Sequence, residues 1–306
     1  MKQAEAPPNA KWSGPSHAGV KAPDPIVLAD PSRRFAATAK RLDELAAGHP
    51  MEAWLRFMAG LARAQHAVAT TLGPAATLGT DTVAQATEAR LPPLAADGHR
   101  RDVSWRDGLM LLLDRIDVAG LPPPALDVME ALRRGDDATL DRLADNFLRG
   151  RVSTTDAAAA VFVAAALQVY FTCSAARLNV DELRLLEERG LCPCCGSPSV
   201  SGVITASGTT PGTRYLHCSM CSTAWNHVRA VCITCGGTRH LSLQSIEGDN
   251  GLVKAETCAD CHTYSKLFFQ VHDMQADPFA DDLASLGLDL LIAEAGFARH
   301  APNPLL

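Results

Sequence analysis

Apolar residues are spaced differently in two parts of the chain. Between residues 32 and about 189 they recur every three or four positions, which is the period of an amphipathic helix. Glycine and proline clusters separate these runs, so we expect helices joined by loops, with a loose segment over residues 75–101. The expected helices cover 32–47, 54–72, 104–116, 125–134, 137–148, 155–178 and 181–189.

Short polar residues mark where two of these helices begin. Ser32 and Asp136 stand immediately before apolar-periodic runs and are the expected N-caps. The run from Ala157 to Ala176 is uncharged and long enough to cross a membrane. Alanine dominates it and Gln168 interrupts it, so we interpret it as the buried helix of a helical bundle and expect no stable membrane insertion.

The pattern changes at Gly190. Cysteine, glycine, serine and threonine replace the helical periodicity, and short β-branched or aromatic runs predict small strands. Helical spacing returns after Phe269, with leucines along one face up to Gly296. We therefore predict an α+β protein in five parts: a poorly ordered tail (1–30), a helical domain (31–189), two modules (190–230 and 231–271), and a C-terminal helix and tail (272–306).

Charge and the N-terminus limit the class of protein. The net charge is −6, which argues against nucleic acid or a membrane surface as partner. The first thirty residues contain lysines but no apolar core of a signal peptide. We therefore expect a cytoplasmic protein. In that reducing compartment clustered cysteines indicate metal or redox chemistry rather than disulfides.

Nine of the ten cysteines lie between residues 192 and 261, and eight of them form four Cys-x-x-Cys pairs. Each member of the last two pairs lies forty residues after a member of the first two, which indicates an internal duplication. Two such pairs offer four thiolates to one ion in tetrahedral geometry, as for structural zinc or rubredoxin-type iron. The predicted ligands are Cys192, Cys195, Cys218 and Cys221 for site 1, and Cys232, Cys235, Cys258 and Cys261 for site 2.

Two arrangements of the pairs fit the spacing. A duplicated unit should bring its own ligands, so we favour one ion within each module. The alternative joins the inner pairs, 218/221 with 232/235, and leaves the outer pairs for a second ion. Gly196 and Gly236 follow the first pair of each module, whereas Ser222 and His262 follow the second, so we expect the second turns to be less regular.

The remaining candidate residues have simpler explanations. Cys194 is expected to be a spare thiol inside the first pair, and Cys173 a small core residue. His217 and His262 adjoin cysteine pairs but are not needed as ligands, because each module already has four sulfurs. Four-sulfur sites leave no coordination position for a substrate, and no catalytic motif is present, so we do not expect an enzyme.

Several long strings in the chain resemble the FdhE family of formate dehydrogenase accessory proteins. The strings run over residues 41–50 and 55–65 in the helical part, 192–196 and 214–221 in the first module, 254–266 in the second, and 280–286 and 296–304 at the C-terminus. The resemblance covers nearly the whole chain beyond the N-terminal tail. The extra cysteine at position 194 leaves the choice of ligands in the first pair slightly open.

This resemblance implies a non-catalytic cytoplasmic chaperone needed for active respiratory formate dehydrogenase. The implied partner is the catalytic subunit, which carries a molybdenum cofactor and an iron–sulfur cluster, and the implied metal is rubredoxin-like iron. A rubredoxin-like electron carrier or redox sensor is the alternative function. A zinc-ribbon nucleic-acid module ranks below it, because residues 191–270 carry five Lys/Arg against four Asp/Glu.

Overall fold

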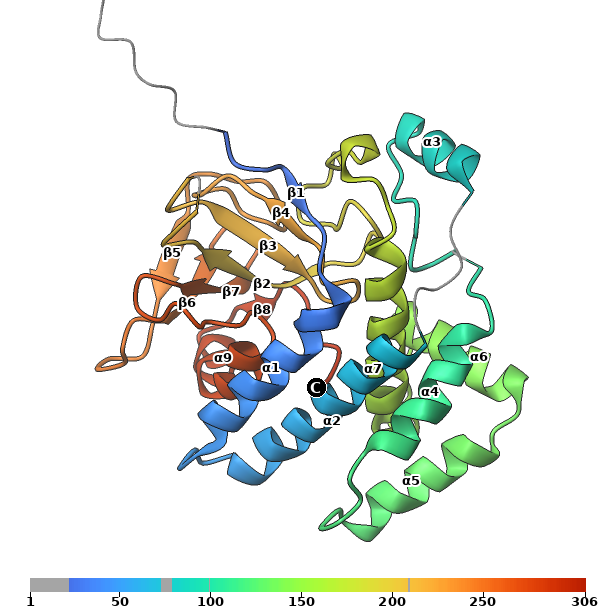
Figure 1. Cartoon of the computed structure of the whole chain (residues 1–306). Coiled ribbons are helices and arrows are strands. Elements are labelled where there is room, and N and C mark those ends of the chain that lie inside the picture. The colour runs from blue at the N-terminus through green and yellow to red at the C-terminus, as the bar shows by residue number, and fades with distance from the viewer. Residues whose placement is uncertain (1–21, 73–78, 99, 209) are drawn as a thin grey trace, which may run out of the picture.

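A helical half and a sheet half pack side by side in the computed structural model, which describes residues 22–72, 79–98, 100–208 and 210–306 (Figure 1). The helical half follows the apolar periodicity, because each helix turns one apolar stripe inward. Its helices are α1 (Pro31–Ala46), α2 (Glu52–Thr71), α3 (Thr80–Glu88), α4 (Ser104–Arg115), α5 (Pro123–Arg134), α6 (Asp137–Leu148) and α7 (Ala157–Ala175).

Helix α7 is the centre of the helical half. Helices α2, α4, α5 and α6 all pack against it, and every residue from Phe162 to Ala175 is buried. It is the one helix in the described ranges with the length and hydropathy of a membrane span, and 78% of that span is buried inside the fold. The uncharged run is therefore explained by burial on all sides, as we expected.

Three details of the helical half differ from the sequence prediction. The N-cap of α1 is Asp30, whose carboxylate accepts from Ser32 N at 2.9 Å, so the predicted cap at Ser32 is wrong by two residues. Residues 80–88, predicted as loop, form α3. The predicted helix over 181–189 is wrong: only the short 3₁₀ turn η1 (Val180–Glu182) forms, and the carbonyl of Arg189 instead accepts a hydrogen bond from the Trp225 indole at 2.8 Å. The cap at Asp136 is confirmed by its bond from Thr139 N.

One mixed sheet runs through both cysteine modules. Its strands are β1 (Ile26–Val27), β2 (Ser199–Ile204), β3 (Arg214–Cys218), β4 (Ala224–Asn226), β5 (Leu241–Gln244), β6 (Val253–Cys258), β7 (Thr263–Phe269) and β8 (Ala298–Arg299). The order is β1-β4-β3-β2-β7-β6-β5, with β8 beside β7. Each module supplies an antiparallel meander of three strands, and parallel pairing of β2 with β7 joins them.

A glycine permits that junction. Gly202 of β2 lies opposite Leu267 of β7, and a Cβ atom at position 202 would stand 2.6 Å from the Leu267 side chain. Any larger residue here would require the Leu267 side chain to shift. The two modules are therefore halves of one sheet rather than separate beads, while the predicted α+β class with two four-cysteine clusters is confirmed.

Both ends of the described chain join this sheet. Strand β1, which lies in the segment predicted as a tail, pairs with β4; residues 1–21 of that tail lie outside the described residues. At the other end the predicted single helix is two short ones, α8 (Ala280–Ala284) and α9 (Leu286–Glu294), followed by β8. Arg41 of α1 binds Asp281 of α8 through two hydrogen bonds of 2.8 and 3.0 Å.

A buried charged network fixes the C-terminal segment to the sheet. Lys266 of β7 and Asp282 of α8 form an ion pair of 2.9 Å, and both side chains are fully buried. Asp282 also accepts from Asn303 at 3.0 Å, and Arg299 contacts it as well. Removal of one partner would leave an unpaired buried charge, so this network holds the end of the chain in one position.

Candidate metal centres

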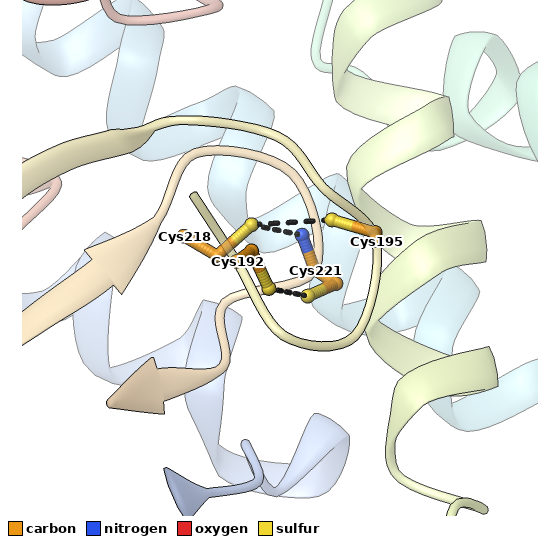
Figure 2. Close-up of side chains that lie close together, drawn as sticks. All are labelled: Cys192, Cys195, Cys218 and Cys221. Atoms are coloured by element: carbon orange, nitrogen blue, oxygen red, sulfur yellow. Dashed lines mark hydrogen bonds between the residues drawn. The ribbon is translucent and has the colours of Figure 1, made fainter. Parts of the chain in front are cut away.

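The first centre brings together the four sulfurs of the first module. Cys192 and Cys195 lie on the turn before β2. Cys218 is the last residue of β3, and Cys221 lies on the turn between β3 and β4 (Figure 2). The sulfurs of Cys192 and Cys221 are 3.4 Å apart, as are those of Cys195 and Cys218. All four residues are buried beside α7.

The second centre repeats this arrangement with the other four cysteines. Cys232 and Cys235 precede β5. Cys258 is the last residue of β6, and Cys261 lies on the turn between β6 and β7. The sulfurs of Cys232 and Cys261 are 3.7 Å apart, and so are those of Cys235 and Cys258. The grouping in both centres is therefore the within-module one, and the inner pairs do not form a joint cluster within the described ranges.

We call the first Cys-x-x-Cys turn of each module its first knuckle and the other its second knuckle. The two first knuckles, 192–195 and 232–235, have the same backbone hydrogen bonds. Cys192 N donates to the carbonyl of Ser197 at 2.9 Å, and forty residues later Cys232 N donates to Gly237 O at 2.8 Å. Backbone amides also point at ligand sulfurs: Cys194 N lies 3.4 Å from Cys192 Sγ, and Thr234 N lies 3.4 Å from Cys232 Sγ. Such amides stabilise thiolate charge.

The second knuckles are as regular as the first, contrary to our expectation. The residue after every pair has a left-handed backbone, with φ of 73° at Gly196, 58° at Ser222, 72° at Gly236 and 54° at His262. Ser222 and His262 adopt this conformation despite their side chains, which costs about 1–2 kcal/mol relative to the right-handed region. The turn that aims the sulfurs therefore overrides residue preference.

A threonine hydroxyl lies against one sulfur of each centre. Thr223 Oγ1 is 3.2 Å from Cys221 Sγ, and Thr263 Oγ1 is 3.0 Å from Cys261 Sγ. The sequence interpretation missed both threonines, although they are separated by the same forty residues as the cysteines. Hydrogen bonds of this kind tune the charge carried by a ligand sulfur.

The spare thiol has a defined place. Cys194 is fully buried, and its sulfur lies 3.5 Å from Thr223 Oγ1, outside the four-sulfur group. The equivalent position in the second module is Thr234, whose hydroxyl receives a hydrogen bond from Thr263 at 2.9 Å. In both modules the residue before the second cysteine of the first knuckle is thus a hydrogen-bond partner of the module's threonine, Thr223 or Thr263.

The two centres differ in how deeply their cysteines are buried. The helical half covers the first: Gln168 of α7 donates to Ser219 O at 2.8 Å, and Leu94 N and Ala96 N each donate at 2.8 Å to the carbonyls of Cys194 and Cys195. Among the described residues no such hydrogen bonds cover the second centre, and there Cys235 is exposed and Cys261 half-buried.

Buried polar groups connect the two modules. Arg214 of β3 pairs with Glu256 of β6 at 2.9 Å, with no side-chain exposure for Arg214 and 9% for Glu256. Burial, reinforced by the charge of Arg214, lowers the pKa of His227 to about 4. Burial likewise lowers the pKa of His300 to about 4. Both imidazoles are therefore neutral at pH 7.

The donor sets fit a tetrahedral thiophilic ion. Four sulfurs bound at 2.3 Å in a tetrahedron lie roughly 3.8 Å apart, close to the 3.7 Å separations of the second centre and slightly beyond the 3.4 Å of the first. The four sulfur atoms of each group lie within 4.8 Å of one another. Both groups can therefore hold zinc or iron, and the geometry is the same for either.

The histidines beside the pairs lie outside both groups. His262 is exposed and contacts the Phe297 ring, with centroids 6.2 Å apart, and His217 faces Arg34 and Asp277. Cys173 is buried in α7, and burial raises the pKa of its thiol to about 11. None of the three belongs to either four-sulfur group.

Comparison with known proteins covers nearly the whole chain. Three FdhE family models match it in succession: the N-terminal model over residues 23–187, the central domain over 191–229 and the C-terminal domain over 230–306. The FdhE homolog of Pseudomonas aeruginosa is 39% identical, with 92% of this chain and 93% of that protein aligned. The FdhE homolog of Edwardsiella ictaluri is 36% identical, with 98% of this chain and 97% of that protein aligned.

The fold agrees with the same family. The crystal structure of the FdhE protein from Pseudomonas aeruginosa superposes with a TM-score of 0.84 at 36% sequence identity, over 92% of this chain and 98% of that one. The resemblance first seen in the cysteine strings and flanking helices is thus confirmed along the chain. The protein belongs to the FdhE family.

Proposed function

We propose that this protein is a non-catalytic cytoplasmic accessory protein for the maturation of a molybdenum-containing respiratory formate dehydrogenase, and that it binds the catalytic subunit of that enzyme. The observation that carries the proposal is the succession of three FdhE models over residues 23–306. The centres agree with it, because four protein sulfurs complete a tetrahedral shell and leave no position for a substrate.

The two halves have distinct parts in this proposal. The first centre fastens the helical half to the sheet through Gln168 and Leu94, so its ion stabilises the fold. The second centre stands at the surface, with Cys235 exposed, and presents a rigid turn to a partner. A metal supplies this rigidity in a module whose own apolar clusters are small.

A deletion strain tests the proposal. Formate dehydrogenase activity should be lost while its transcript is retained, and a tagged copy of this protein should co-purify with the catalytic subunit. Complementation with the full chain should restore the activity. Unchanged activity after deletion would refute the function, and restored activity without any captured subunit would refute the direct contact.

A rubredoxin-like electron carrier is the second candidate function. The exposed Cys235 favours it, because electron transfer needs a metal close to the surface. Iron bound to four thiolates supplies a reversible one-electron couple and a visible spectrum, which zinc does not. Protein purified without air should therefore be examined by metal analysis, absorption and voltammetry, and a zinc-only preparation would exclude this function.

A further inference from the structure

The duplication shows what should cover the first knuckle of the second module, Cys232–Cys235. In the first module, residues 92–96 of the helical half lie across the knuckle and bury it. Leu94 N and Ala96 N donate to the adjacent carbonyls of Cys194 and Cys195, each at 2.8 Å. Pro92 covers Gly196: the Cγ atom of Pro92 would be 3.0 Å from a Cβ atom placed on Gly196.

The same surface in the second module is bare. The carbonyls equivalent to those of Cys194 and Cys195 belong to Thr234 and Cys235, and no backbone N–H in the described residues donates to either of them. Gly236, equivalent to Gly196, has nothing within 4 Å of its Cβ position. Cys194 and Cys195 are 0% and 1% exposed, whereas Thr234 and Cys235 are both exposed.

The bare surface is also preformed. The two first knuckles have the same backbone hydrogen bonds and the same left-handed residue, so their carbonyls are presented alike. Thr234, Cys235 and Gly236 line a surface hollow of ≈ 480 Å³ together with residues 187–191. An occupant needs no rearrangement of the knuckle, and two free carbonyls are strong acceptors that the first module satisfies with protein.

We propose that the first knuckle of the second module, Cys232–Cys235, is a docking site for an uncharged backbone segment of the client protein, bound as residues 92–96 bind the first knuckle of the first module. This inference rests on the proposed function for the identity of the client. The segment should present backbone N–H groups at residues i and i+2 to the carbonyls of Thr234 and Cys235. A proline at i−2 should lie against Gly236, and no residue of the segment needs a charge.

A peptide experiment tests the surface without the client. Full-length zinc-loaded protein labelled with ¹³C and ¹⁵N is titrated with a synthetic peptide of residues 91–97, Leu-Pro-Pro-Leu-Ala-Ala-Asp. Carbonyl and amide signals of residues 234–236 should shift, and those of 194–196 should not. The same peptide N-methylated at the positions of Leu94 and Ala96 should bind about tenfold more weakly or worse, because both hydrogen bonds are lost.

The variant Gly236→Asn provides a second test of the docking site in the same peptide titration. Asparagine tolerates the left-handed backbone, yet its side chain would occupy the place of the proline. The variant should keep two metal equivalents and lose the peptide-induced shifts. The matched control is Gly248→Asn, because Gly248 also has a positive φ of 84° and open space around it. Absence of shifts at 234–236, or equal shifts with the N-methylated peptide, overturns the docking site.

Capture of the catalytic subunit separates this inference from the proposed function. Wild-type protein and Gly248→Asn should retain the subunit, and Gly236→Asn should retain about tenfold less. Equal retention by all three overturns the docking site and leaves the function standing. No retention by wild type refutes the proposed direct contact with the catalytic subunit instead. Concentration-dependent dimers that the peptide dissociates would identify a second copy of this chain as the occupant and overturn the client assignment.

Discussion

Gln168 donates a hydrogen bond from Nε2 to the carbonyl oxygen of Ser219 at 2.8 Å, which joins the central helix to the second knuckle of the first centre. Gln168 also accepts from Gln65 of α2 at 3.0 Å. These groups are buried, so each bond that is broken leaves a polar atom without water. The one amide side chain of this mostly apolar helix is thus one of the links between the two halves.

Replacement of that amide should loosen the link. Gln168→Leu should lower the free energy of unfolding by about 1–3 kcal/mol, because Ser219 O and Gln65 Nε2 each lose a buried partner. Denaturant unfolding of the zinc-loaded protein measures this change. Gln85→Leu on the exposed face of α3 is the control and should be nearly neutral. Equal effects of the two substitutions would contradict the role given to Gln168.

The assignment of ligands can be checked by counting metal. Cys258→Ser should bind one equivalent and unfold the second module, because a closed thiolate site contributes folding free energy directly. Cys194→Thr should bind two, since threonine occupies the equivalent position 234 of the second module. Elemental analysis of both variants makes the measurement. Loss of metal from Cys194→Thr would show that the buried fifth thiol is a ligand.

The two centres should release metal at different rates. A chromogenic chelator should empty the second centre first, because Cys235 is exposed while all four ligands of the first are buried. Alkylation during the release, followed by mass spectrometry, should label Cys235 and Cys261 before Cys192 and Cys195. The opening of buried sites needs local unfolding and is therefore slower. Simultaneous release would mean that burial does not control exchange.

Stability should fall on mild acidification through His227. Burial holds the folded-state pKa of His227 at about 4, against an ordinary value of 6.5. Since the unfolded chain binds the proton first, the stabilising contribution is complete above pH 6.5 and is lost as the pH falls toward 4. Between pH 7 and pH 5.5 this one group should cost about 1 kcal/mol.

The matching variant is His227→Gln, which cannot titrate. Its unfolding free energy should decline less than that of the wild type over the same pH interval, with both proteins zinc-loaded and their metal content confirmed at each pH. An identical decline in the two proteins would show that another group, and not His227, controls the acid response.

The sequence predicted the elements whose signal is local. The period of apolar residues located α2, α4, α6 and α7, and the forty-residue offset located both four-sulfur groups. The period of apolar residues did not predict α3, whose residues 80–88 carry only one buried apolar side chain, Val83. It also predicted a helix over 181–189 where tertiary contacts, such as the bond from Trp225 to Arg189, hold the chain in turns.

What the sequence could not show is which segments meet. The parallel pairing of β2 with β7 brings Gly202 against Leu267, and such a contact leaves no periodic trace along the chain. The cover over the first centre comes from residues 92–96, about a hundred residues before the cysteines they protect. The difference in exposure between two modules of equal cysteine spacing is therefore a property of the fold alone.

The pairing of Arg41 with Asp281 sets an order on biosynthesis. The two residues are separated by 240 positions, so α1 cannot reach its ionic partner until those intervening residues have been synthesised. The residues of β4 that pair with β1 are synthesised earlier, whereas β8 can pair with β7 only after Arg299 has been added. Such distant contacts slow folding, and on the ribosome the first knuckle of the second module would be synthesised before its C-terminal neighbour His300.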